Sequence, residues 1–144
     1  MDVPATNYVK TPSGIYIAYQ VIGNGPIDLV YLPGYASNLR WQWELPSYAK
    51  FLVRLASFSR LIVVDRRGTG LSDRFSPQDL PPLEELADDV LTVMKAVGSE
   101  QVALLGSEDG CFVCSMFAAT HPDRTRRSRC GRGTRRRCPS RRCW

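Results

Sequence analysis

Apolar residues along this chain follow two spacings, one typical of strands and one typical of helices. Nearly continuous apolar runs, the pattern of strands buried on both faces of a parallel sheet, occur at Ile27 to Leu32, Leu61 to Val64 and Val102 to Leu105. Helical spacing predicts three helices between and after them, at Pro46 to Phe58, Leu83 to Val97 and Cys111 to Thr120. Strands that alternate with helices predict an α/β fold with a parallel, doubly covered sheet.

Glycine-marked turns divide these elements. Residues Tyr8 to Ile22 alternate around Gly14, which predicts two short antiparallel strands at the start of the chain. Each buried strand is followed by a glycine-marked loop, at Gly34, Gly68 and Gly106. Because the carboxyl ends of parallel strands share one edge of a sheet, we expect the ligand site at the edge where these loops meet.

The turn from Gly106 to Gly110 carries the clearest functional pattern. A strand, a glycine-flanked turn and a helix form a nucleophile elbow, whose central residue is held in a strained backbone conformation. The usual G-x-S-x-G signature places serine at the centre, whereas the centre here is Glu108 and serine stands one position earlier, at Ser107. We expect Glu108 at the nucleophile position. Ser107 is the less favoured candidate, because it would require an elbow slipped by one residue.

No histidine or thiol is predicted at this elbow. His121 is the only histidine, and it follows the elbow by a helix of about 15 Å, well beyond the ~3 Å reach of a general base. Cys111 and Cys114 have C-x-x-C spacing but are predicted to be small packing residues. Close paired spacing, which zinc sites need, is absent from Cys130, Cys138 and Cys143. We expect neither a metal nor a cofactor.

Charge divides the chain near residue 124. Nine Lys and Arg and all fourteen Asp and Glu come before it, whereas ten Arg and no Lys or acid follow from Arg124 to Trp144. This last segment has no aliphatic residue, so no strand or core helix is predicted after Thr125. We expect a domain at 1–125 and a disordered Arg-rich tail at 126–144. Two interpretations of the tail stay open: a basic arm for nucleic acid, or out-of-frame translation, which the abrupt change favours. Either way, binding to nucleic acid would be non-specific.

The ends of the chain suggest a compartment. The first residues lack the basic and apolar regions of an export signal, and no apolar stretch has the length of a membrane span. We therefore expect a cytoplasmic protein without a membrane partner. Five cysteines, an odd number, then favour thiols over a disulfide framework.

Several segments together match a known pattern, at Ile17 to Gly23, Leu32 to Gly34, Leu55 to Ile62, Asp65 to Asp73 and Phe117 to Thr125. Through them the chain resembles the N-terminal half of an α/β-hydrolase-fold domain. In particular, it is similar to the hydrolase-like domains that precede class III adenylate cyclase domains, or helix-turn-helix domains, in actinobacterial signalling proteins. The run Asp-x-Arg-Gly-x-Gly-x-Ser within Asp65 to Asp73 is the most specific of these segments.

The resemblance implies a partial α/β-hydrolase fold, truncated after the elbow helix, of hydrolase ancestry and with a small ester-like ligand. It also implies that the backbone amides of Tyr35 and Asp109 are the oxyanion donors. The missing half of such a domain supplies further strands, the lid, the triad acid and the triad histidine, so we expect a pseudoenzyme, inactive alone. The strand from Val102 to Leu105 would then have an open edge, through which the protein would self-associate.

An active alternative also follows from the resemblance. Dehalogenases and epoxide hydrolases of this fold use an acid at the elbow to form an ester intermediate, so Glu108 could be a carboxylate nucleophile in a site completed by another chain. Those enzymes use Asp, and the extra methylene of Glu displaces the carboxylate by more than ~1 Å, a shift that can cost about 10²-fold in rate. Asp65, Arg66 and Arg67 are expected to tie their loop together through hydrogen bonds to backbone groups.

Overall fold

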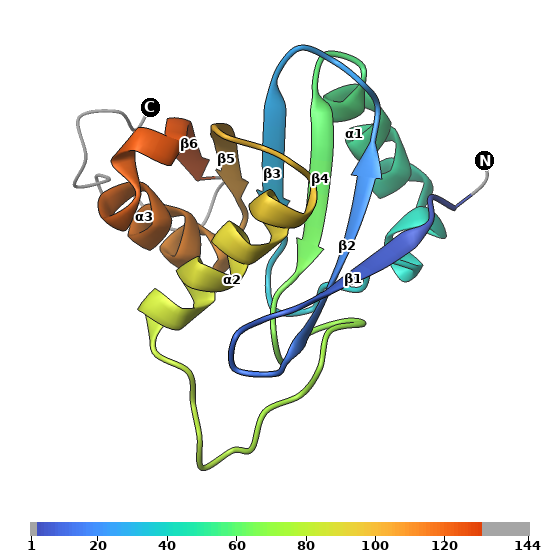
Figure 1. Ribbon diagram of the computed structural model, residues 1–144. Helices are drawn as coiled ribbons and strands as arrows, with labels where there is room; N and C mark the ends of the chain where they lie inside the picture. Colours follow the sequence, from blue (N-terminus) through green and yellow to red (C-terminus); the bar gives the residue numbers. More distant parts are fainter. Residues whose placement is uncertain (1–2, 131–144) are drawn as a thin grey trace.

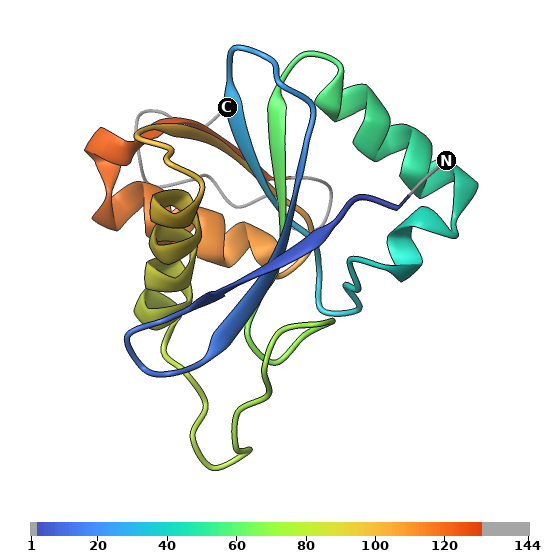
Figure 2. The same cartoon turned by 45° about the vertical axis from the view of Figure 1, so that its right-hand side comes forward.

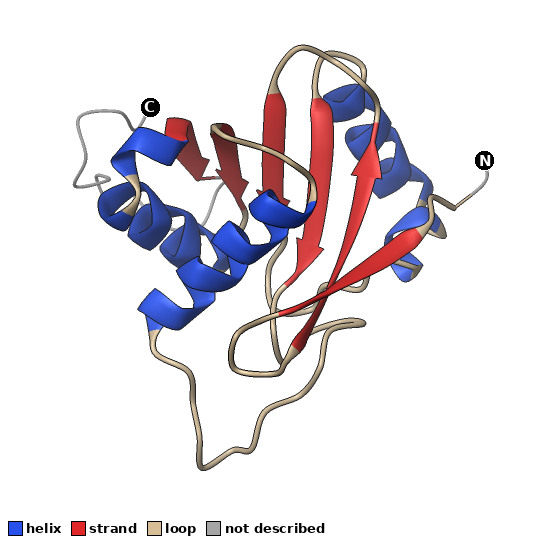
Figure 3. Ribbon diagram, in the orientation of Figure 1, coloured by secondary structure: helices blue, strands red, loops and turns tan. Residues whose placement is uncertain are grey.

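The computed structural model describes residues 3–130, which form a six-stranded sheet with helices on both faces (Figure 3). The strands are β1 (Thr6–Lys10), β2 (Tyr16–Ile22), β3 (Asp28–Leu32), β4 (Arg60–Asp65), β5 (Val102–Gly106) and β6 (Thr125–Cys130). The α-helices are α1 (Pro46–Ala56), α2 (Leu83–Ala96) and α3 (Gly110–Thr120), and single 3₁₀ turns occur at η1 (Trp41–Trp43) and η2 (Pro122–Arg124). The strands and helices predicted before residue 125 are thus confirmed.

The sheet has the order β1-β2-β4-β3-β5-β6. The hairpin of β1 and β2 turns at Gly14, which has a φ of 88°, and pairs antiparallel to β4. The four strands β4, β3, β5 and β6 are all parallel. The predicted α/β architecture with a mostly parallel sheet is therefore confirmed, with an antiparallel hairpin added at one side.

Alternation along β3 divides the core into two layers. Val30 and Leu32 pack on the side of α2 and α3, whereas Leu29 and Tyr31 pack on the side of Leu52 in α1. All four are buried, as a central strand covered on both faces requires. Figure 1 and Figure 2 show α2 and α3 on one side of the sheet and α1 on the other.

The prediction that no strand follows Thr125 is wrong. Residues Thr125–Cys130 form β6, which pairs with β5 in parallel, with a register shift between Val102 and Ala103. Ladder hydrogen bonds join main-chain N–H and C=O groups, which every residue but proline supplies, so a strand at an edge needs no aliphatic side chain. The remainder of the predicted tail, residues 131–144, lies outside the described residues.

The strand β6 also corrects the predicted open edge. β5 lies between β3 and β6, so the far side of Val102–Gly106 is paired and the outer edge belongs to β6. Self-association through a sheet edge stays a prediction, and it would now involve residues 125–130.

The loops that follow β3, β4 and β5 meet at one edge of the sheet. All three strands run parallel, so Leu32, Asp65 and Gly106 end at the same side. This is where ligands bind in open parallel sheets. Within residues 3–130, no helix combines the length and apolar character that crossing a membrane would require.

Candidate functional site at the elbow

The turn between β5 and α3 has the geometry of a nucleophile elbow. Glu108 has a φ of 50° and is the one non-glycine residue among residues 3–130 with positive φ. The turn is closed by hydrogen bonds from the Gly110 amide to the Ser107 carbonyl, at 2.9 Å, and from the Cys111 amide to the Glu108 carbonyl, at 3.2 Å. A left-handed glutamate is strained, so the surrounding turn holds it there.

Close approach explains the two glycines that flank this turn. A Cβ on Gly110 would overlap the Leu32 carbonyl oxygen of β3, and one on Gly106 would lie 2.7 Å from the Cys111 amide nitrogen. The Ser107 amide also donates to the Leu32 carbonyl, at 3.1 Å. The elbow is therefore pressed onto the end of β3, where backbone atoms leave no space for a side chain.

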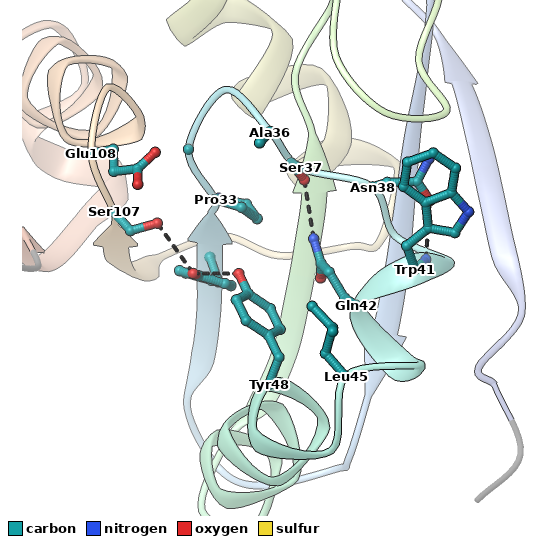
Figure 4. Close-up of a pocket in the computed structure, with 12 residues that line it drawn as sticks. Pro33, Ala36, Ser37, Asn38, Trp41, Gln42, Leu45, Tyr48, Ser107 and Glu108 are labelled. Carbon is teal, nitrogen blue, oxygen red and sulfur yellow. Dashed lines mark hydrogen bonds between the residues drawn. The ribbon is translucent and has the colours of Figure 1, made fainter.

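The side chain of Glu108 extends over the loop that follows β3. A Cβ on Gly34 would overlap the Glu108 Oε2 atom, so the carboxylate lies against the Gly34 backbone. Within residues 3–130, no donor forms a hydrogen bond with this carboxylate. Figure 4 shows it at the mouth of a cavity, beside Ser107.

The predicted oxyanion donors lie on either side of Glu108 in these two loops. Asp109 is the N-cap residue that directly precedes α3, and its side chain pairs with Arg66 at 2.7 Å. Tyr35 follows Gly34, and its side chain is exposed. Neither amide donates a hydrogen bond to another of the described residues. Their role as oxyanion donors stays a prediction.

Ser107 belongs to a chain of hydroxyl groups and not to the apex. Its Oγ lies 3.2 Å from the Tyr31 hydroxyl, which lies 2.7 Å from the Tyr48 hydroxyl (Figure 4). Burial raises the pKa of Tyr48 strongly, and the hydrogen bond to Tyr31 adds to the effect, so the phenol stays neutral. These hydroxyl contacts fix the orientation of the Ser107 side chain, which lines the cavity described next.

A cavity of about 410 Å³ opens in front of the elbow. Its walls come from the elbow, from the loop after β3, from η1 and from the first turn of α1. The volume lies in the range of about 300–1,000 Å³ that is typical of small-molecule sites. Ser37, Gln42 and Tyr48 line it, and none of the three was identified from the sequence. Ser37 and Gln42 lie outside any periodic segment, and the helical spacing of α1 does not show that Tyr48 faces a cavity.

Asp65 organises the loops around this cavity. Its carboxylate accepts hydrogen bonds from the Leu39 amide at 3.1 Å, from the Leu71 amide at 2.8 Å and from the Ser37 hydroxyl. The predicted role of Asp65, binding backbone groups of its own loop, is therefore observed. It extends to the loop after β3 as well.

The two arginines that follow were predicted to bind backbone groups, and instead they bind carboxylates. Arg67 is buried and donates from Nε and Nη2 to the two carboxylate oxygens of Asp89 in α2, at 2.6 Å each. These hydrogen bonds raise the pKa of Arg67. Arg66 reaches Asp109 at the elbow. The loop is thus held to α2 and α3 by ion pairs, which sequence spacing alone does not indicate.

His121 lies at the far end of α3, as predicted. Its ring stacks on Phe117 with centroids 4.8 Å apart, and its Nε2 is 3.9 Å from an Asp88 oxygen. Neither contact is with a residue of the cavity. Cys111 and Cys114 are buried in the core side of α3, consistent with the predicted packing role.

Comparison with known proteins identifies the fold. The family model of the alpha/beta hydrolase fold matches residues 29–127. The chain belongs to this family. The match extends into β6 and includes the elbow, the Asp65 loop and the cavity walls.

Similar proteins of this family have several activities. The chain is 32% identical over 101 residues to epoxide hydrolase B of Mycobacterium tuberculosis. This match covers 69% of this chain and 26% of that protein. It is 31% identical over 122 residues to the serine hydrolase BPHL of Mus musculus, covering 80% and 38%. The crystal structure of an esterase from Rhodococcus sp. ECU1013 superposes with a TM-score of 0.73 and 32% identity, over 87% of this chain and 44% of that one. The chain thus spans less than half the length of each of these relatives.

Proposed function

We propose that this polypeptide binds a small ester-like or epoxide-like molecule in the elbow cavity and does not turn it over. The observation that carries the proposal is the identity of the strained residue, since Glu108 occupies the φ of 50° where a serine hydrolase presents its nucleophile. The neighbouring serine, Ser107, stands one position before the apex, and its hydroxyl is hydrogen-bonded to that of Tyr31. The ligand classes are those that the names of the relatives indicate.

Turnover of the serine type needs a base beside the nucleophile, and within residues 3–130 no histidine lies near the elbow. The sequence contains one histidine, His121, which stacks on Phe117 at the opposite end of α3. A general base must lie within about 3 Å of the proton it takes. Without nucleophile and base, the two amides of Tyr35 and Asp109 can polarise a carbonyl but cannot cleave the ester.

The proposal is tested with a short alkyl ester and a small epoxide. Binding is followed through the indole N–H resonance of Trp41, whose side chain is 66% exposed at the rim of the cavity, and consumption is followed by chromatography. We expect the resonance to shift and the probes to be consumed no faster than with Glu108→Gln protein. Consumption well above that control would contradict the proposal, as would an unshifted resonance with both probes.

A second candidate function is supported by the free carboxylate of Glu108 and by the similarity to epoxide hydrolase B. In this reaction a Glu108 oxygen attacks an epoxide carbon and the ring C–O bond breaks. The released alkoxide takes a proton from water, and hydrolysis of the resulting ester returns the carboxylate and a diol. A second chain would complete the site.

This alternative predicts epoxide consumption that depends on residue 108. Glu108→Gln would abolish it, whereas Glu108→Asp would preserve or raise it, because Asp is the elbow acid of the dehalogenases and epoxide hydrolases of this fold. Equal background rates for all three proteins would exclude it.

We also infer a signalling context from the resemblance to cyclase-linked domains. The support is the set of segments that includes Ile17 to Gly23 and Asp65 to Asp73, which the structure places at β2 and at the loop beside the cavity. A ligand-binding module that does not turn over its ligand suits a sensor. The coding sequence downstream of codon 125 tests this inference. A cyclase or helix-turn-helix domain in one of its frames would support the inference, and neither in any frame would contradict it.

A further inference from the structure

Three hydroxyl groups form a row along one side of the cavity. The Tyr31 hydroxyl lies 2.7 Å from that of Tyr48 and 3.2 Å from that of Ser107, and all three residues line the cavity. Tyr31, at the centre of the row, is 3% exposed, whereas Tyr48 and Ser107, at its two ends, are only partly buried. Figure 4 shows the hydroxyls of Ser107 and Tyr48 pointing toward one another along this row. The two ends are therefore its accessible parts.

The row carries one proton more than its own hydrogen bonds use. Each hydroxyl has one proton to donate and can also accept, and the raised pKa of Tyr48 keeps its proton in place. Because Tyr31 is buried, its proton points to one of its two neighbours, and the other neighbour donates to Tyr31. Within residues 3–130, the hydroxyls of Ser107 and Tyr48 have no further hydrogen-bond partner. One end of the row therefore offers a donor to the cavity while the other end offers an acceptor.

The two ends are close enough to share one ligand oxygen. Both hydrogen bonds meet at the Tyr31 oxygen, so the oxygens of Ser107 and Tyr48 lie roughly 5 Å apart for the usual angle at a hydroxyl oxygen. One oxygen atom that forms hydrogen bonds of about 2.8 Å to both ends can span up to about 5.6 Å. Phe51 holds the row in place, since the rings of Tyr31 and Tyr48 pack edge-on against it with centroids 5.5 Å and 5.9 Å away. The gap therefore suits a single group that accepts from one end and donates to the other.

We propose that this row selects an alcohol, whose hydroxyl accepts a hydrogen bond from one end and donates one to the other, closing a ring of four hydroxyl groups. The inference rests on the proposed function in so far as that function places a ligand in this cavity. It adds the chemical group that the ligand presents beside the elbow. A ketone or an ether of the same shape can only accept, so it leaves one end of the row without a partner. Ester hydrolysis releases an alcohol and epoxide hydrolysis gives a diol, so the row favours the products of that chemistry over their precursors.

Two probes of nearly one shape test this selection: cyclohexanol, which donates and accepts, and cyclohexanone, which only accepts. Their dissociation constants are measured from the indole N–H resonance of Trp41, which also lines the cavity. We expect cyclohexanol to bind about threefold to tenfold more tightly, the effect of one additional neutral hydrogen bond. Equal affinities, tighter binding of the ketone, or no binding of either probe would overturn the inference.

Two substitutions remove one end of the row each. Tyr48→Phe keeps the ring that packs against Phe51, and Ser107→Ala deletes the hydroxyl at the other end. Either variant should bind the two probes equally, because only one hydrogen bond to each probe remains. Tyr8→Phe, on an exposed tyrosine of β1 outside the cavity, is the matched control and should keep the wild-type preference. Since both probes are compared in the same protein, a general change in the cavity cancels from the ratio of their dissociation constants.

The outcomes distinguish this inference from the proposed function. If esters and epoxides shift the Trp41 resonance but cyclohexanol binds no more tightly than cyclohexanone, the proposed function holds and the alcohol inference is wrong. If cyclohexanol is preferred as described but an ester is consumed, the reverse is true. A preference for cyclohexanol that survives in both Tyr48→Phe and Ser107→Ala would overturn the role of the row.

Discussion

Replacing Glu108 with glycine should stabilise this protein, although glycine normally destabilises. Glu108 has a φ of 50°, where a side chain costs roughly 1–2 kcal/mol that glycine does not incur. Glycine adds roughly 0.5–1 kcal/mol of backbone entropy to the unfolded chain. The carboxylate forms no hydrogen bond with the described residues, so its loss subtracts little. The net expectation for Glu108→Gly is about 0–1.5 kcal/mol of added stability.

Glu44 provides the matched control. It is also an exposed glutamate in a loop beside the cavity, but its φ is −77°. Glu44→Gly should therefore lose about 0.5–1 kcal/mol, since it gains no relief of strain. The two glycine variants should differ by about 1–2 kcal/mol, whereas Glu108→Ala, which retains a Cβ, should show none of the relief.

Urea unfolding of the four proteins measures these differences as shifts in midpoint at a common slope. Thermal unfolding provides a second reading, in which 1 kcal/mol corresponds to roughly 2–4 °C for a chain near this length. If Glu108→Gly loses as much stability as Glu44→Gly, then residue 108 is not held in a left-handed conformation. The elbow would in that case lack the strained apex on which the proposed site depends.

Two further predictions concern the frame around the site. Gly110→Ala should lower the free energy of unfolding by more than about 2 kcal/mol, because the new Cβ would overlap the Leu32 carbonyl of β3. It should also abolish the ligand-induced shifts of the Trp41 resonance. A urea midpoint equal to that of the wild type would refute the close approach. Arg60 donates two hydrogen bonds of 2.6 Å to Asp28, and these lower the Asp28 pKa below its ordinary value. The stability from this pair is present above pH ~4 and is lost as the pH falls through the folded pKa, so Asp28→Asn should be less stable than wild type at pH 7 and should approach it in acid. A constant difference across that range would contradict the assignment.

Much of the fold follows from the spacing of apolar residues. β3 and β4 are almost uninterrupted apolar runs, and a strand covered on both faces has no other way to bury its side chains. The position of Glu108 was also predictable, because the glycines on either side permit an approach to β3 that fixes the turn. In these cases the residue type that the tertiary contact requires, apolar in a buried strand and glycine at a close approach, is also the one that the local sequence pattern indicates.

The strand β6 and the cavity wall could not be predicted in this way. β6 is held by backbone pairing with β5, for which its Arg and Ser residues give no periodic signal. Gln42 and Tyr48 become part of the site only because η1 and α1, which follow β3 in the sequence, lie beside the elbow in the folded chain. Tyr31 and Ser107, whose hydroxyls lie 3.2 Å apart, are distant in the sequence, and hydroxyl pairing leaves no pattern in either segment.

The central claim is that Glu108 occupies the nucleophile position but does not react. Intact-protein mass spectrometry after incubation with excess of a small epoxide tests it most directly, because a covalent ester at residue 108 adds the mass of one epoxide. The account predicts an unchanged mass, equal to that of Glu108→Gln protein treated in the same way. A stoichiometric adduct that maps to Glu108 and is absent from Glu108→Gln would contradict the account and establish a carboxylate nucleophile.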